Sequence, residues 1–256
     1  MINVIALDLD GTLLNNYKMV SRRSVEVLLN LKAKGFKIIF ATARAPRSIV
    51  RVLPKELHHE TWICYNGVEI YENLNKEQVE YLDLESAIGA VRYFEKIFPD
   101  RPVTVEIDNK IYTNLEIEGN TTYELANLYN IIKQPVTKIL IRIDKKNDDI
   151  DVIRRGLPVR CRLVVMETTE LAQVLSVNAS KICALKKVLN NYGLSMENVI
   201  SFGDDINDIE MLVESKVGVA MGNASELVSR NADYTTCSNT EDGVAVFLER
   251  YFGQVS

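Results

Sequence analysis

Short, largely apolar runs recur along the first part of the chain. Residues 2–9 form one run, which ends in Asp10-Gly11-Thr12, and residues 36–41 form another, which stops at Thr42. Apolar runs of this length predict strands that are buried on both faces, as in a parallel sheet. The polar residues that follow each run are therefore expected at the carboxyl ends of the strands.

A segment with helical spacing separates these two runs. Val25, Leu28 and Leu29 fall on one face of a helix, Ser21 precedes them as a potential N-cap, and Gly35 follows where helices often end. This pattern predicts a helix between the first two strands.

The next segments extend the alternation. Pro46 favours the first turn of a short helix. Asn66-Gly67 lies between apolar runs at 62–65 and 68–71, which is typical of a β-hairpin with a two-residue turn. The resulting order of strand, helix, strand, helix, strand predicts an α/β sheet with parallel strands.

The middle third of the chain has a different pattern, in which helical segments alternate with paired strands. Asp108-Asn109 marks one of the turns. The expected elements are helices at 84–98, 121–130 and 148–155 and strands at 103–107, 110–113, 136–143, 160–167 and 171–176. This mixed run indicates a separate α+β domain that is inserted into the α/β one.

The α/β pattern then resumes. The expected elements are a helix that Ser180 precedes and Gly193 ends, further helices at 206–214, 224–229 and 242–251, and strands at 198–202 and 217–221. The predicted architecture is a Rossmann-like parallel-sheet core, residues 1–82 and 173–256, with an inserted α+β cap domain at 83–172.

Composition excludes several classes of protein. Hydrophobic residues make up 47% of the 256 and charged residues 25%, which is enough apolar material for a core and argues against disorder. The net charge is −5 and no basic run occurs, so we expect no nucleic-acid partner. No apolar run approaches the roughly 18 residues of a membrane span, and the N-terminus lacks the basic region of a signal peptide. We therefore expect a cytoplasmic protein without membrane contacts.

Cysteine and histidine usage offers no other chemistry. The four cysteines are scattered without a CxxC pair, so we expect free thiols in a reducing compartment; they are Cys64, Cys161, Cys183 and Cys237. His58 and His59 are adjacent in a polar loop, where solvated side chains are expected rather than a zinc site or a Ser-His triad.

Four polar groups lie where the predicted strands end or the predicted helices begin. They are Asp8-Leu9-Asp10-Gly11-Thr12, Thr42-Ala43-Arg44, Asn178-Ala179-Ser180-Lys181 and Gly203-Asp204-Asp205-Ile206-Asn207-Asp208. The first three groups have ordinary explanations when taken alone, which are a turn, a helix cap and a solvated lysine. In an open α/β sheet, however, ligands bind at the carboxyl ends of the strands, and this shared position favours one common site.

The acidic members of these groups suit a hard divalent cation. Asp8 and Asp10 repel each other without a cation, and the three carboxylates between 204 and 208 exceed what helix capping requires. If the two groups face each other, they supply oxygen ligands for Mg²⁺. An EF-hand loop does not fit, because Gly11 comes fourth from Asp8 rather than sixth.

In this order, the four groups resemble the motifs of the haloacid dehalogenase superfamily, and in detail those of its Cof-type sugar-phosphatase-like branch. Further matching segments are Tyr65-Asn66-Gly67, Ala220-Met221-Gly222-Asn223-Ala224, Asn231-Ala232-Asp233-Tyr234 and Glu241-Asp242-Gly243-Val244-Ala245. The motif resemblance covers about 1–80 and 175–250, and the insert resembles the family's cap by position and length. Ala43 and Ile182 depart from the pattern, since the family usually has glycine at the first position and often at the second.

This resemblance implies a Mg²⁺-dependent phosphatase that hydrolyses small phosphorylated metabolites, sugar phosphates above all, through an aspartyl-phosphate. It implies that Asp8 is the nucleophile and that Asp10 is the general acid and base. It also implies that Asp8, the Asp10 backbone carbonyl and Asp204 hold Mg²⁺. Asp208 would then lie behind these ligands and hold a metal-bound water or Lys181.

The resemblance further assigns Thr42, the Ala43 N–H and Lys181 to the substrate phosphate. It implies that Asn207 orients either the phosphate or Lys181. Substrate choice is expected to depend on the cap. Two other functions stay open: a phosphomutase on the same fold, and a non-catalytic regulatory protein that binds phosphorylated metabolites. The expected partners are small phosphate esters, and the expected assembly is a monomer or a weak homo-oligomer.

Overall fold

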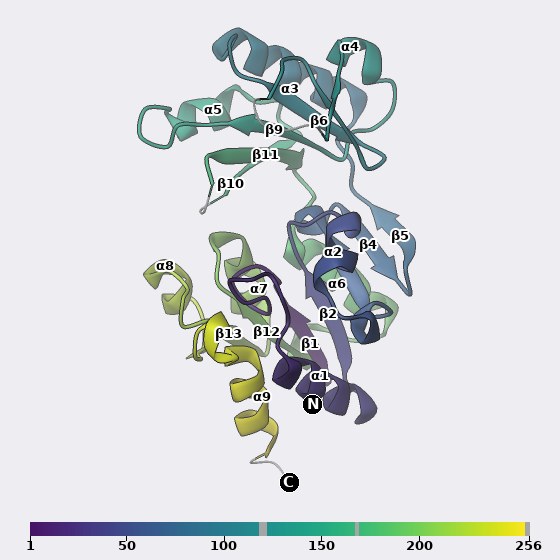
Figure 1. Ribbon diagram of the computed structural model, residues 1–256, viewed down its shortest axis with the longest axis vertical. Coiled ribbons are helices and arrows are strands. Elements are labelled where there is room, and N and C mark those ends of the chain that lie inside the picture. The colour runs from purple at the N-terminus through teal and green to yellow at the C-terminus, as the bar shows by residue number, and fades with distance from the viewer. Residues whose placement is uncertain (118–121, 167–168, 254–256) are drawn as a thin grey trace. The chain divides into compact units, whose positions relative to one another are not determined.

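The computed structural model describes residues 1–117, 122–166 and 169–253, and the chain forms two compact units (Figure 1). The first, the core unit, comprises Met1–Gln78 and Ser180–Ser256, and the second, the insert unit, comprises Val79–Ala179. The insert expected from the sequence at 83–172 lies within the second unit. That unit extends four residues further toward the N-terminus and seven further toward the C-terminus.

The core unit contains an eight-stranded sheet within the described residues, in the order β14-β13-β12-β1-β2-β3-β4-β5. The strands are β1 (Val4–Leu7), β2 (Lys37–Ala41), β3 (Thr61–Cys64), β4 (Glu69–Glu72), β5 (Asn75–Val79), β12 (Val199–Gly203), β13 (Val217–Ala220) and β14 (Tyr234–Thr235). The strands from β14 to β3 are parallel, and β4 is antiparallel to β3. The predicted α/β fold with a parallel-sheet core is therefore confirmed.

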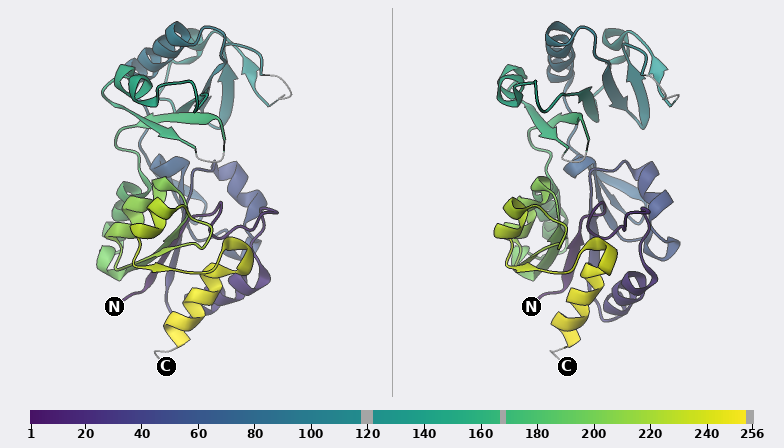
Figure 2. Two further views of the ribbon diagram at one scale, coloured as in Figure 1. Left: turned by 90° about the vertical axis from the view of Figure 1, so that its left-hand side faces the viewer. Right: turned by 60° about the vertical axis from the view of Figure 1, so that its left-hand side comes forward.

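Helices cover both faces of this sheet (Figure 2). They are α1 (Arg22–Ala33), α2 (Pro46–Val52), α6 (Lys181–Asn191), α7 (Ile209–Glu214), α8 (Glu226–Arg230) and α9 (Gly243–Gly253). Leu185 of α6 packs in one cluster with Val199 of β12. Phe202 of the same strand instead meets Phe247 of α9, with the ring centroids 5.7 Å apart. Because successive side chains of a strand point to opposite faces, α6 and α9 lie on opposite sides of the sheet.

Local signals set the helix ends as the sequence predicted. The Ser21 side chain accepts a hydrogen bond from the backbone N–H of Ser24, and Gly35 follows α1 with φ +91°. Ser180 caps α6 in the same way through the N–H of Cys183. Pro46 occupies the first turn of α2. Short 3-10 turns also occur at Lys55–Leu57, Tyr65–Gly67, Met196–Asn198, Ile206–Asp208 and Asn239–Glu241.

The hairpin between β3 and β4 is present, but its predicted two-residue turn is wrong. Cys64 pairs with Glu69, so four residues connect the strands. Asn66 and Gly67 have φ values of +57° and +103°, as this dipeptide favours. A Cβ on Gly67 would lie only 2.2 Å from the Ser180 carbonyl oxygen, so the turn is packed against the start of α6. The four-residue connection thus packs against a segment that is distant in the sequence, and no local pattern reveals that contact.

The insert unit has its own six-stranded sheet within the described residues, in the order β10-β11-β9-β6-β7-β8. Its elements are α3 (Leu84–Ile97), β6 (Val103–Ile107), β7 (Lys110–Thr113), β8 (Glu124–Leu125), α4 (Leu128–Ile131), β9 (Lys138–Arg142), α5 (Ile150–Gly156), β10 (Cys161–Val165) and β11 (Leu171–Ser176). Phe94 of α3 and Ile153 of α5 share one buried cluster with Val105 of β6, so these helices cover one face of the sheet. The hairpin around Asp108-Asn109 is confirmed. In the described part of the chain, no helix has the length and apolar character that crossing a membrane requires.

The helix predicted at 121–130 is wrong. Thr121 lies outside the described residues, Glu124–Leu125 forms strand β8 beside β7, and α4 begins only after Asn127. The Asn127 side chain accepts a hydrogen bond from the N–H of Tyr129, so it caps a new helix instead of continuing an old one. Pairing with β7 is a non-local contact and overrides the helical pattern. Glu167, at the end of another predicted strand, also lies outside the described residues.

We expect Gly67→Ala to destabilise the core unit more than Gly35→Ala. Both glycines have positive φ values, but a Cβ meets nothing within 4 Å at Gly35 and the Ser180 backbone at Gly67. The left-handed backbone costs either variant about 1–2 kcal/mol, and overpacking adds about 1–3 kcal/mol for Gly67→Ala alone. Urea unfolding of both variants measures the difference. Equal losses would show that the turn moves freely away from α6.

Candidate active site

The parallel core sheet brings the predicted site residues to one edge. Asp8 follows β1, Thr42 follows β2, and Asp204 follows β12. Strand β1 lies between β2 and β12, so Asp8 is flanked by the ends of both neighbours. Its backbone N–H donates to the carbonyl of Phe202 at 3.1 Å, which continues the ladder to the first residue of the site.

A buried lysine joins two of the carboxylates. Lys181 Nζ lies 2.6 Å from Asp8 Oδ1 and 2.7 Å from Asp208 Oδ1, and the side chains of Lys181 and Asp208 are 1% and 0% exposed. Asp208 Oδ2 accepts the backbone N–H groups of Asp204 and Asp205, both at 3.1 Å. Both oxygens of Asp208 are thus occupied by the protein. A buried ammonium group is stable only with such partners.

Burial also sets the protonation behaviour of this cluster. It raises the pKa of Asp8 well above its usual value, a shift that the charge of Lys181 opposes and the charges of Asp208 and Asp204 reinforce. Burial alone would lower the pKa of Lys181, but Asp208 and Asp8 outweigh it and raise that pKa. The lysine therefore stays charged, and a single cation faces several carboxylates.

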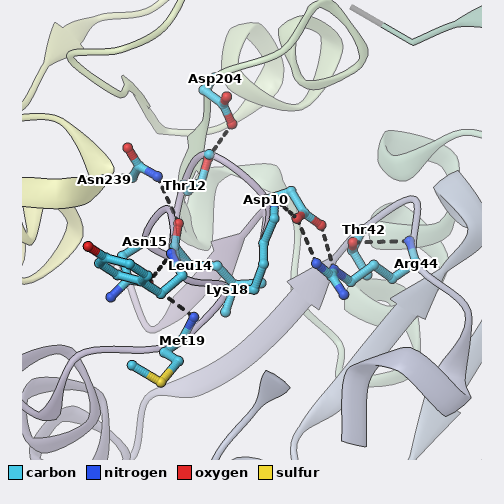
Figure 3. Close-up of polar contacts among 12 residues, drawn as sticks. Asp10, Thr12, Leu14, Asn15, Lys18, Met19, Thr42, Arg44, Asp204 and Asn239 are labelled. Carbon is cyan, nitrogen blue, oxygen red and sulfur yellow. Dashed lines mark hydrogen bonds and ion pairs between the residues drawn. The ribbon is translucent and has the colours of Figure 1, made fainter. Parts of the chain in front are cut away.

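Asp204 completes the cluster. Its Oδ1 accepts the Thr12 hydroxyl at 2.8 Å, as Figure 3 shows. Burial, and then the nearby charge of Asp208, raise its pKa to about 7. Gly11 is required at this point because it has φ +81° and a Cβ there would lie 2.0 Å from Asp204 Oδ2.

The three carboxylates form a group that could hold a metal ion. Asp8, Asp204 and Asp208 each offer an oxygen, and these oxygens lie within 4.8 Å of one another. Carboxylate oxygens are hard ligands, and a cation bound here would offset the burial and the charge of Asp208 that raise the pKa of Asp8 and of Asp204. The residues present therefore fit a divalent cation. Because Asp208 already bonds to Lys181 and to backbone N–H groups, Asp8 and Asp204 are the better placed ligands.

Asp10 is not a member of this group. Its side chain lies beside Arg44 and Lys18 instead (Figure 3). Arg44 binds it with two hydrogen bonds, Nε to Oδ2 at 2.5 Å and Nη2 to Oδ1 at 2.7 Å, and Lys18 Nζ lies 2.7 Å from Oδ1. Partial burial raises the pKa of Asp10, but hydrogen bonds from Arg44 and Lys18 outweigh it, so the pKa is lowered overall. The pKa of Asp10 therefore shifts in the opposite direction to those of Asp8 and Asp204.

Asn66 connects Thr42 and Asn207, because it makes a hydrogen bond with each of them. Thr42 is buried, and its hydroxyl oxygen accepts the Arg44 N–H at 3.1 Å, so the hydroxyl proton can serve another acceptor. The Asn66 backbone N–H donates to the Thr42 carbonyl at 2.9 Å, and the Asn66 side chain accepts from Asn207 Nδ2 at 3.0 Å. Ala43 lies between Thr42 and Arg44 in the same turn.

Sequence reasoning missed the roles of several residues in this site. They are Thr12, Lys18, Arg44, Asn66 and Asn223, of which all but Lys18 stood within segments already singled out. Asn223 donates to the Gly11 carbonyl at 2.8 Å and so connects the loop after β13 to the loop after β1. Lys18 lies in an irregular segment after the first motif, and only the tertiary structure places it beside Asp10.

Comparisons with known proteins find relatives that match nearly the whole chain. The profile of the haloacid dehalogenase-like hydrolases matches residues 5–248. YitU of Bacillus subtilis, a 5-amino-6-(5-phospho-D-ribitylamino)uracil phosphatase, is 29% identical over 97% of this chain and 97% of its own. The pyridoxal phosphate phosphatase YbhA of Escherichia coli is 27% identical over 96% of this chain and 97% of its own. A haloacid dehalogenase-like hydrolase structure from Bacteroides thetaiotaomicron matches with a TM-score of 0.83 and 28% identity, covering 98% of this chain and 100% of that one.

The family match extends well beyond the four motifs. Residues 5–248 include most of the core unit and the whole of the insert unit, so the match covers both units of the chain. The named relatives are phosphatases and align over nearly their full length. The chain therefore belongs to the haloacid dehalogenase-like hydrolases, as an enzyme of their Cof-type phosphatase branch.

Proposed function

We propose that this enzyme is a Mg²⁺-dependent phosphatase that hydrolyses small phosphorylated metabolites, sugar phosphates foremost, through an aspartyl-phosphate on Asp8. One observation carries the proposal, which is the buried contact of Asp8 with Lys181 beside the carboxylate of Asp204. Lys181 fixes the orientation of the nucleophile and offers a positive charge to the phosphoryl group. Positioning and charge neutralisation are what phosphoryl transfer chiefly requires.

The covalent sequence has two steps. In the first, a carboxylate oxygen of Asp8 attacks phosphorus, the ester P–O bond breaks, and the leaving alkoxide takes a proton from Asp10. In the second, water attacks the aspartyl-phosphate and gives a proton to Asp10, which releases inorganic phosphate and restores Asp8. The ionised Asp10 of this structure suits the second step. To act as an acid in the first, it must be protonated, which requires release from Arg44 and Lys18.

The remaining assignments concern charge. Asp8, Asp204 and the backbone carbonyl of Asp10 would hold Mg²⁺, with Asp208 fixing Lys181 behind them. When bound, the ion supplies positive charge that offsets the repulsion between the Asp8 carboxylate and the phosphate dianion. Thr42, the Ala43 N–H, Lys181 and Asn207 would bind phosphoryl oxygens as fixed donors.

The names of the relatives widen the substrates to be examined. YitU is named for a phosphorylated ribitylamino-uracil and YbhA for pyridoxal phosphate. A screen should therefore include such compounds together with sugar phosphates, and measure release of inorganic phosphate with and without Mg²⁺. Release of phosphate supports hydrolysis. Isomerisation without release would identify a phosphomutase, and binding without either would identify a regulatory protein.

Asp8→Asn should abolish phosphate release, by about 10³-fold or more, because an amide is neither a nucleophile nor an anionic ligand. Asp205→Asn is the matched control. Its carboxylate accepts the N–H of Ile206 at 2.7 Å and does not belong to the metal-binding group, and an amide oxygen can make the same bond. Steady-state rates of both variants decide the matter. Activity of Asp8→Asn within tenfold of wild type would exclude the covalent route.

Asp10→Asn should slow phosphate release by about 10²–10⁴-fold, since the acid and base are lost. Mg²⁺ binding should persist, because the proposed ligand at this residue is its backbone carbonyl. Calorimetric titration of Mg²⁺ into the variant, compared with wild type, checks this. Loss of Mg²⁺ binding in a folded Asp10→Asn protein would assign the metal to the side chain instead.

Mg²⁺ affinity should rise with pH around neutrality. The pKa of Asp204 is about 7 without metal, so most Asp204 carries a proton at pH 6 and little does at pH 8. Because the ion displaces that proton, the apparent affinity should be about tenfold weaker at pH 6 than at pH 8. The shift of Asp8 acts in the same direction. Titrations at both pH values, with Asp204→Asn as control, measure the effect, and equal affinities in wild type would contradict it.

A further inference from the structure

The turn formed by Tyr65–Gly67 contacts three of the motif segments at once. The N–H of Asn66 donates to the Thr42 carbonyl, the Asn66 side chain bonds to Asn207, and Gly67 lies flush against Ser180, next to Lys181. Three residues with proposed phosphate roles therefore meet around this one turn. Nothing in the proposed chemistry uses Asn66 itself.

The contact between the two asparagine amides is incomplete in one respect. Asn207 Nδ2 donates to Asn66 Oδ1 at 3.0 Å. The other amide atoms, Asn66 Nδ2 and Asn207 Oδ1, are buried and have no hydrogen-bond partner among the described residues. Asn66 as a residue is only 4% exposed. Unpaired buried amide atoms are rare because their desolvation is not compensated, so a pair of them beside a binding site points to a missing partner.

A half-turn of both amides produces a second arrangement with nearly the same heavy-atom positions. Asn66 Nδ2 then donates to Asn207 Oδ1, and the two unpaired atoms become Asn207 Nδ2 and Asn66 Oδ1. A phosphate oxygen only accepts hydrogen bonds, so it can pair with this amino group and not with a carbonyl oxygen. Substrate would therefore select the second arrangement.

We propose that Asn66 is a positioning residue that donates to Asn207 Oδ1 and thereby presents the amino group of Asn207 to the substrate phosphate. This inference rests on the proposed function. Asn66 does not touch the substrate, and it acts only through Asn207. Its backbone, at φ 57° and ψ 32°, is left-handed, a conformation that asparagine, aspartate and glycine tolerate better than other residues.

Two substitutions at this position separate a positioning role from a structural one. Asn66→Asp keeps the size and the backbone preference but removes the donor, so Asn207 Nδ2 stays bound to residue 66 and its carbonyl faces the phosphate. Asn66→Gly keeps the backbone conformation and leaves the Asn207 amide free to turn. If Asn66 only shaped the turn, the aspartate variant would be the milder of the two.

The experiment measures binding of inorganic phosphate to the full chain with Mg²⁺, together with KM and kcat, for wild type, Asn66→Asp and Asn66→Gly. We expect Asn66→Asp to weaken phosphate binding by about 10- to 100-fold, the scale of one hydrogen bond to a charged group. Asn66→Gly should weaken it less. In the kinetic measurements, we expect Asn66→Asp mainly to raise KM and to change kcat little, because Asp8 and Asp10 are unchanged.

Making the same two substitutions in an Asn207→Ala background separates the effect of the added negative charge from the effect of orienting Asn207. There the donor has nothing to orient, so Asn66→Gly should cause no further loss, and any loss from Asn66→Asp measures repulsion alone. Losses that are equal in both backgrounds would overturn the proposal. Wild-type protein that neither binds phosphate nor releases it from esters would overturn the proposed function, and this inference with it. Normal wild-type activity with additive losses overturns the inference alone.

Discussion

The buried contact of Lys181 with Asp8 and Asp208 is the interaction on which the rest of the site depends. An ammonium group without water is costly unless charged partners surround it, and here two carboxylates lie within 2.7 Å. Through them the lysine joins the end of β1, the start of α6 and the loop after β12. Asp208 is held in turn by two backbone N–H groups of that loop, so the position of the lysine also determines the position of Asp204.

This arrangement separates the carboxylates into two electrostatic environments. Asp8 is buried and Asp204 is partly buried, both lie near Asp208, and their pKa values are raised. Asp10, two residues from Asp8, turns to Arg44 and Lys18, and its pKa is lowered. The two environments differ because the side chain of Asp8 points toward Lys181, whereas that of Asp10 points toward Arg44 and Lys18.

Close packing of the backbone around three glycines makes these two electrostatic environments possible. Gly11 admits the Asp204 carboxylate, and Gly203 admits the side chain of Asp208, whose Cβ would lie 2.4 Å from a Cβ at that position. Gly67 plays the same part between the turn after β3 and the start of α6. Side chains at these three positions would push the loops apart and separate the charged groups. The charges of the site and the glycines between them therefore form one structural unit.

The sequence by itself determined the α/β core, most of the strands and helix caps, and the set of motifs that identifies the family. Apolar runs, capping residues such as Ser21 and Ser180, and the order of Asp8, Thr42, Lys181 and Asp204 are local signals, and each was correct about its own segment. Contacts between distant segments were decided only by the tertiary structure. Pairing with β7 replaced the predicted helix around Glu124, and ion pairs with Arg44 and Lys18 turned the Asp10 side chain out of the carboxylate group. Such contacts depend on how loops from several strands meet at one sheet edge, and no periodicity within a single segment records that.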